Sequence, residues 1–119
     1  MNNQELIQKL EALPGEIKLK SLELLDIQAQ IDIFQDQVST LKVQAMEKVL
    51  TDGLATNDKA RQTAQASILA KDQLFIDADL SLRVEQKKLR YEQVQLELLH
   101  NQFKAYLAIA GMLSVPEVH

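Results

Sequence analysis

Residues 17–45, IKLKSLELLDIQAQIDIFQDQVSTLKVQA, decide the fold because their apolar side chains repeat with a helical period. An apolar residue stands at every seventh position, and another follows three places after each of the middle ones, which is the spacing of a coiled-coil seam. These positions are Ile17, Leu24, Ile27, Ile31, Phe34, Val38, Leu41 and Ala45. The stretch therefore predicts a long helix that buries one side against another helix.

The composition of the 119-residue chain supports a helical fold. It contains only 3 Gly and 2 Pro, whereas an antiparallel sheet needs a turn about every ten residues. Leu, Ala, Gln, Glu and Lys are abundant, and all of them form helices well. We therefore expect an all-α chain that forms one domain over 1–119.

The turn-forming residues divide this domain into helices. Pro14 is expected to kink or break the first helix, Gly53 to end the second in a left-handed conformation, and Asn57 or Thr56 to cap the third. The predicted elements are a short helix over 1–13, a long helix over 16–50, a turn over 51–57, a long helix over 58–113 and a tail over 114–119.

A second seam follows the turn and predicts how the long helices pair. It consists of Ile68, Phe75, Leu82, Leu89, Leu96 and Phe103, with Ala78 and Leu99 three places on from two of them. Because a short connection makes long helices antiparallel neighbours, residue x should lie opposite roughly residue 110 − x. The predicted fold is a long antiparallel two-helix coiled-coil hairpin. Lys20 interrupts the first seam, and Glu85 and Glu92 interrupt the second.

A further set of apolar residues lies two places after seam positions, which is a rotation of about 200° around the helix. The set consists of Leu22, Ala29, Val43, Leu50, Val84, Tyr91 and Leu98. A two-helix hairpin buries only one side of each helix, so this set predicts self-association into a helical bundle, most simply a homodimer that forms four helices. The alternative is that these are ordinary surface residues.

One pair of residues three positions apart on a predicted helix suggests a metal site. Glu97 and His100 have the Glu-x-x-His spacing by which ferritin-like bundles supply two ligands from one helix. A dinuclear site needs a second such pair and two more carboxylates, so we expect no metal and no cofactor. A metal-binding helical bundle is kept as a third hypothesis. Asp72 and Asp79 share a helix face but lie about 10 Å apart, and Asp77 points elsewhere, so the three are interpreted as solvated surface.

A basic stretch suggests an alternative function. Arg83, Lys87, Lys88 and Arg90 are candidates for contacts to nucleic acid. The stretch contains Glu85 and is followed by Glu92, no groove-reading motif accompanies it, and the net charge of the chain is −4. Nucleic-acid binding is therefore kept as the alternative hypothesis.

Other features exclude whole classes of function. The chain has no Cys and no Gly-rich phosphate loop, and we find no Ser-His-Asp set that its two His residues could complete, so we expect no enzymatic activity. Its longest nearly apolar run, 105–113, is far shorter than the roughly 20 residues that span a bilayer. We expect a cytoplasmic protein that does not enter membranes.

Several of these features occur together in a recognisable order. Leu13-Pro14, the long charged helix, Gly53, Asn57 with Arg61, Asp72 and NQFKAYLAIAGML (101–113) follow one another along the chain. In this order the chain resembles small helical-hairpin proteins found in phage and prophage genomes. That class has no assigned activity, so the resemblance supplies no catalytic or binding residue. It implies an accessory or adaptor role in a phage or mobile element, alongside recombination or against a host defence, with an unidentified protein partner.

Overall fold

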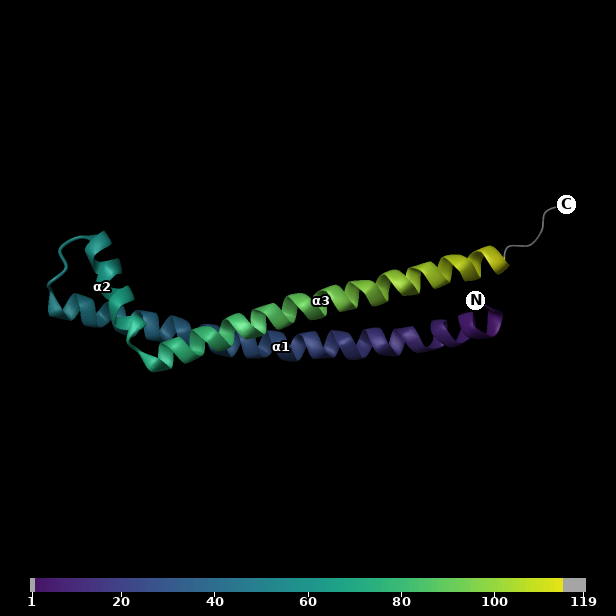
Figure 1. Ribbon diagram of the computed structural model, residues 1–119, viewed down its shortest axis with the longest axis horizontal. Coiled ribbons are helices and arrows are strands. Elements are labelled where there is room, and N and C mark those ends of the chain that lie inside the picture. The colour runs from purple at the N-terminus through teal and green to yellow at the C-terminus, as the bar shows by residue number, and fades with distance from the viewer. Residues whose placement is uncertain (1, 115–119) are drawn as a thin grey trace. The chain divides into compact units, whose positions relative to one another are not determined.

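A computed structural model describes residues 2–114, and every regular element in that range is an α-helix (Figure 1). Helix α1 spans Asn3–Asp52, α2 spans Asp58–Ala70 and α3 spans Gln73–Ser114. The prediction of an all-α protein is therefore confirmed. Residues 115–119 of the predicted tail lie outside the described residues.

The helices form two compact units, which are described separately. The first unit combines the chain up to Asp26 with the chain from Leu89 onwards, so it contains the start of α1 and the later part of α3. The second unit, Ile27–Lys88, contains the rest of α1, all of α2 and the start of α3.

The buried residues of both units occupy one side of each helix. In the first unit Leu6 and Leu13 are buried, and the seam residues Ile17 and Leu24 are half-buried. The buried residues of the second unit are Ile27, Ile31, Val38, Ala45, Val49, Leu69, Ala78 and Leu82. Most of these occupy positions of the two predicted seams.

Helix α1 begins at a capping box and continues through Pro14. The Asn2 side chain accepts a hydrogen bond from the Glu5 backbone N–H at 2.8 Å, and the Glu5 carboxylate accepts one from the Asn2 backbone N–H. The predicted break at Pro14 is wrong, because α1 is a single helix from Asn3 to Asp52. Proline removes one backbone hydrogen bond, but the burial of Leu6 and Leu13 holds the helical turns before it in place. A kink at Pro14 stays a prediction.

The connection between α1 and α2 has the predicted turn chemistry. Gly53 follows the last residue of α1 with a φ of 66°, and its backbone N–H donates to the Val49 carbonyl oxygen at 3.3 Å. Asn57 caps α2, because its side-chain oxygen accepts a hydrogen bond from the Ala60 N–H at 2.8 Å. Asp58 adds a negative charge to the first turn of α2, where it complements the helix dipole.

The predicted continuous helix over 58–113 is wrong, because Lys71 and Asp72 separate α2 from α3. Backbone bonds from Lys71 N–H to the Ile68 carbonyl and from Asp72 N–H to the Leu69 carbonyl tighten the end of α2. The Asp72 carboxylate then accepts a hydrogen bond from the Leu74 N–H at 3.0 Å. Short polar side chains compete with helical bonding in this way, and here the side chain of Asp72 starts a new helix.

Two glycine substitutions test the backbone conformation, one after the end of α1 and one inside it. Gly53→Ala is expected to lower the free energy of unfolding by about 1 kcal/mol, because a Cβ atom strains a left-handed residue. An added Cβ would meet no atom within 4 Å there, so strain alone should determine the effect. Urea unfolding followed by circular dichroism at fixed protein concentration measures the change.

Gly15→Ala is the matched control, because Gly15 lies inside α1 and an added Cβ meets nothing within 4 Å there either. Alanine in a helix interior should raise the free energy of unfolding by about 0.5–1 kcal/mol. A loss of stability with Gly15→Ala would contradict a continuous helix through Pro14.

Candidate functional site

The most prominent surface feature is the amount of exposed apolar side chain. Ten apolar residues are buried within residues 2–114, whereas eighteen large ones are exposed. All seven residues of the predicted oligomer interface are among the exposed positions of the chain: Leu22, Ala29, Val43, Leu50, Val84, Tyr91 and Leu98. Their exposure agrees with the expected direction of these side chains, and their role in assembly stays a prediction.

These residues belong to a longer stripe on α3, here called the α3 outer face. Its positions alternate by three and four residues, which is the spacing of a second coiled-coil seam. It consists of Leu80, Val84, Lys87, Tyr91, Val94, Leu98, Asn101, Ala105, Ala108 and Met112, all exposed. Only Lys87 and Asn101 are polar. The seven-residue repeat of Val84, Tyr91 and Leu98 does not include Leu80 and Val94, which supply intermediate steps and were not predicted.

Helix α1 carries a corresponding stripe, here called the α1 outer face. It has the same alternation and consists of Leu19, Leu22, Asp26, Ala29, Ile33, Asp36, Thr40, Val43, Glu47 and Leu50, all exposed. Leu19 and Ile33 were missed for the same reason as on α3. This stripe is more polar than the α3 outer face, since it includes three carboxylates.

Both stripes lie on the side of their helix that faces away from its buried residues. Leu82 and Val84 show this directly, because they are two residues apart on α3 and are 8% and 54% exposed. Two residues correspond to about 200° around a helix. Packing of α1 and α3 against each other therefore leaves both outer faces in contact with water.

The first unit also contains a polar contact within its packed side. The Lys20 ammonium donates hydrogen bonds to the Glu92 carboxylate and, at 3.1 Å, to the Glu23 carboxylate. Lys20 and Glu92 were predicted as separate interruptions of the two seams, and the structure pairs them within about two residues of the expected register. The side chain of Glu92 is 12% exposed, so Lys20 is the partner that satisfies a mostly covered charge.

This contact changes the titration of the lysine. The hydrogen bonds from Lys20 to Glu92 and then to Glu23 raise the pKa of Lys20 above its ordinary value of 10.5, and they outweigh the opposing effect of desolvation. The ammonium form is therefore favoured in the folded chain.

The four residues of the basic stretch are exposed and lie at the edge of the α3 outer face or within it. Lys87 lies within this face. Arg83, Lys88 and Arg90 lie beside it, and Arg83 is paired with Asp79 at 3.0 Å. A single helix brings these residues to one side, and their charges border apolar side chains on the same surface.

The candidate metal ligands are not brought together with further ligands. Glu97 and His100 are both exposed, and no group of three or more His, Cys, Asp or Glu residues able to hold a metal is present within residues 2–114. The acidic residues noted in the sequence have other contacts. Asp72 caps α3, Asp77 accepts a hydrogen bond from Gln73, and Asp79 pairs with Arg83.

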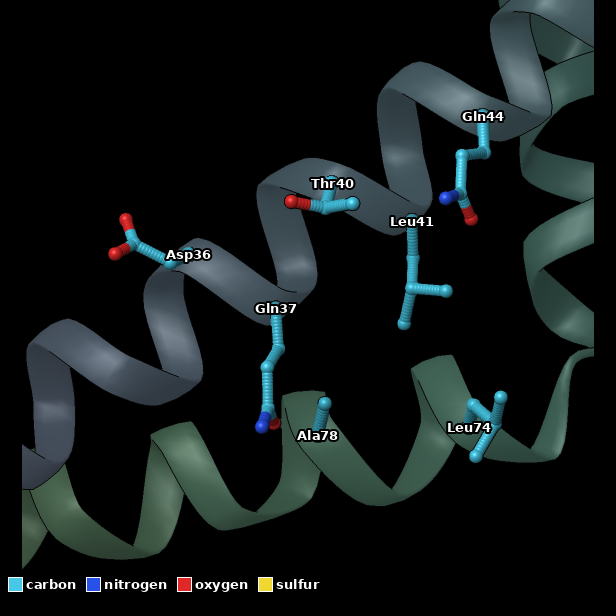
Figure 2. A pocket seen from close by; sticks show the side chains of 7 residues that line it. All are labelled: Asp36, Gln37, Thr40, Leu41, Gln44, Leu74 and Ala78. Carbon is cyan, nitrogen blue, oxygen red and sulfur yellow. The ribbon is translucent and has the colours of Figure 1, made fainter.

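A groove of about 430 Å³ lies in the second unit between α1 and the start of α3 (Figure 2). The side chains of Gln37 and Leu41 point from α1 toward α3, where Ala78 lies, whereas Asp36 points away from α3 (Figure 2). The residues that line it are Asp36, Gln37, Thr40, Leu41, Gln44, Leu74 and Ala78. This lining offers amide groups and apolar surface, without an imidazole, thiol or amine that could pair with the carboxylate for acid–base work.

Within the described part of the chain, none of the three helices has the length and apolar character needed to cross a bilayer. Comparison of the chain with protein-family models, with curated proteins and with solved structures gave no match. The resemblance to phage and prophage helical hairpins therefore stays a prediction.

The contact between Lys20 and Glu92 leads to a test by substitution. Lys20→Met is expected to lower the melting temperature, because it leaves the mostly covered Glu92 carboxylate without this partner. Lys20→Met combined with Glu92→Leu is expected to restore the melting temperature or exceed it, because two apolar residues extend the seam. Glu23→Gln, which removes only the more exposed partner, serves as the control. Equal losses in the single and double variants would show that the pair is not coupled.

The same contact predicts a dependence on pH. Because the folded-state pKa of Lys20 is raised, its contribution to stability is fully present below pH 10.5 and is lost as the pH rises through the folded-state pKa. Wild type should therefore lose more stability than Lys20→Met between about pH 10 and 12. Thermal unfolding across this range measures the difference. Parallel losses in the two proteins would contradict the assignment.

Proposed function

We propose that this chain is a non-enzymatic assembly protein, a two-helix coiled-coil hairpin that associates with copies of itself through its outer faces. The observation that carries the proposal is the alternation of exposed residues along α3 from Leu80 to Met112, which are apolar at every position except Lys87 and Asn101. Coiled-coil partners recognise such a stripe by inserting side chains between its residues.

The hairpin part of the proposal is supported by contacts inside each unit. In the first unit, Lys20 of α1 bonds to Glu92 of α3. In the second, the Gln65 side chain on α2 donates a hydrogen bond to the Lys42 carbonyl oxygen on α1 at 2.8 Å. The short connection from Gly53 to Asn57 also favours helices that fold back on each other.

The hydrophobic effect supplies the driving force for association. Fully burying a large apolar side chain contributes about 1.5–3 kcal/mol, so each half-exposed residue on an outer face forgoes about 1 kcal/mol. Six large apolar residues of the α3 outer face are exposed: Leu80, Val84, Tyr91, Val94, Leu98 and Met112. A partner that covers this stripe gains several kcal/mol, which offsets part of the entropy cost of association.

The setting of this activity is part of the proposal. The resemblance to phage and prophage helical hairpins points to an accessory or adaptor role in a mobile element, in which an assembled helical scaffold binds another protein. We place this role in the cytoplasm, in keeping with a chain that has no Cys for disulfides.

Self-association is tested by charging the α3 outer face. Val84→Glu combined with Leu98→Glu is expected to weaken self-association at least about ten-fold, because each carboxylate would have to be buried in the contact. Sedimentation velocity over a range of protein concentrations measures the association constant. Both residues are exposed, so helical content measured by circular dichroism should not change.

Gln86→Glu combined with Gln93→Glu is the matched control, because it adds the same two charges at exposed positions of α3 that lie off the outer face. This variant is expected to associate like wild type. Wild type that stays monomeric at high concentration would refute the proposal, as would a Val84/Leu98 variant that associates normally.

A further inference from the structure

The two outer faces carry opposite charge. The charged residues on each outer face and at the positions beside it form two unlike sets, over residues 16–50 of α1 and 74–112 of α3. On α1 these are the acidic residues Glu16, Glu23, Asp26, Asp32, Asp36 and Glu47, with Lys18 as the one base. On α3 they are the basic residues Arg83, Lys87, Lys88, Arg90 and Lys104, with the acids Asp77 and Glu97. All of these residues are exposed.

Most of these charges have no ionic partner among the described residues. Within residues 2–114, Glu23 pairs with Lys20 and Arg83 pairs with Asp79, and none of the others takes part in an ion pair. The charges that remain are therefore free to pair with charges brought by a partner surface.

We propose that copies of this chain associate through unlike faces, with the α1 outer face of one copy packed on the α3 outer face of another. This inference rests on the proposed function and specifies the contact. In a coiled coil, the charged residues that flank the apolar stripe select the partner, because opposite charges attract and like charges repel across the contact.

Contacts between identical faces would be less favourable. Two α3 outer faces would bring two sets of five basic residues together, and two α1 outer faces would bring two sets of six acidic residues together. Repulsion between like charges at such close range opposes both arrangements. The contact between unlike faces avoids this repulsion and still covers both apolar stripes.

The polar residues inside the stripes agree with this pairing. Lys87 lies within the α3 outer face, which has no acidic residue between Leu80 and Met112. The α1 outer face contains Asp26, Asp36 and Glu47 within its stripe. A lysine that is covered on association needs a carboxylate opposite it, and only the α1 outer face supplies one.

The test uses one variant for each face. Leu22→Lys with Val43→Lys blocks the α1 outer face, and Val84→Glu with Leu98→Glu blocks the α3 outer face. All four residues are exposed, so each variant should keep the helical content of wild type, which circular dichroism checks. Sedimentation velocity is measured on wild type, on each variant alone and on their equimolar mixture.

The expected result is that each variant alone associates at least about ten-fold more weakly than wild type and that the mixture associates. In the mixture, the intact α3 outer face of one variant meets the intact α1 outer face of the other. Wild-type association should also weaken as salt is raised, because the flanking charges are screened.

Three outcomes would overturn the inference. If one variant alone associates like wild type, the contact joins identical faces. If both variants are folded and monomeric and the mixture stays monomeric, the two faces do not meet. If a labelled duplex DNA binds wild type and loses binding on Lys87→Glu with Lys88→Glu while self-association is unchanged, the basic residues serve nucleic acid. Monomeric wild type would instead refute the proposed function itself.

Discussion

The structure depends on a limit of helix packing: two helices that pack together cover one side of each and leave the other side in water. In most small proteins the uncovered side is polar. Here both long helices are apolar on two sides, as Leu82 and Val84 show by being buried and exposed only two residues apart. The fold therefore buries one side of the apolar pattern in the sequence and leaves the other side exposed to water.

Polar residues interrupt both the seams, on the covered side of the helices, and the outer faces, on the uncovered side. Their consequences differ between the two sides. On the covered side, Lys20 and Glu92 satisfy each other, so an interruption of both seams becomes a contact that fixes the register of α1 against α3 in the first unit. On the uncovered side, Lys87 and the three carboxylates of the α1 outer face have no ion pair within the described chain. A charge that finds its partner inside the chain contributes to the fold, whereas a charge without one is available for recognition.

Much of the fold could be predicted from the sequence because its signals are periodic or local. The seams predicted most of the buried residues. Gly53 and Asn57 predicted the turn after α1, which Gly53 stabilises through its left-handed backbone and Asn57 through its side-chain hydrogen bond. Pro14 misled the prediction because propensity is weaker than the burial of Leu6 and Leu13 beside it. The break at Asp72 was missed because the apolar period continues across it, whereas the local hydrogen bonds of Lys71 and Asp72 separate α2 from α3. The outer faces were predicted only in part, since a seven-residue repeat finds alternate members at most.

The division of charge between the faces gives the basic stretch a different interpretation from the one its composition suggests. Arg83, Lys87, Lys88 and Arg90 resemble a site for phosphate when they are considered alone, because a cluster of bases on one helix attracts any anion. A nucleic-acid backbone needs only charge from such a cluster, whereas a helical partner also needs an apolar stripe at coiled-coil spacing. The bases of α3 border a stripe of that kind, and the acids of α1 border its counterpart. The combination of charge with a matching apolar period therefore favours a second copy of the chain over an anionic polymer.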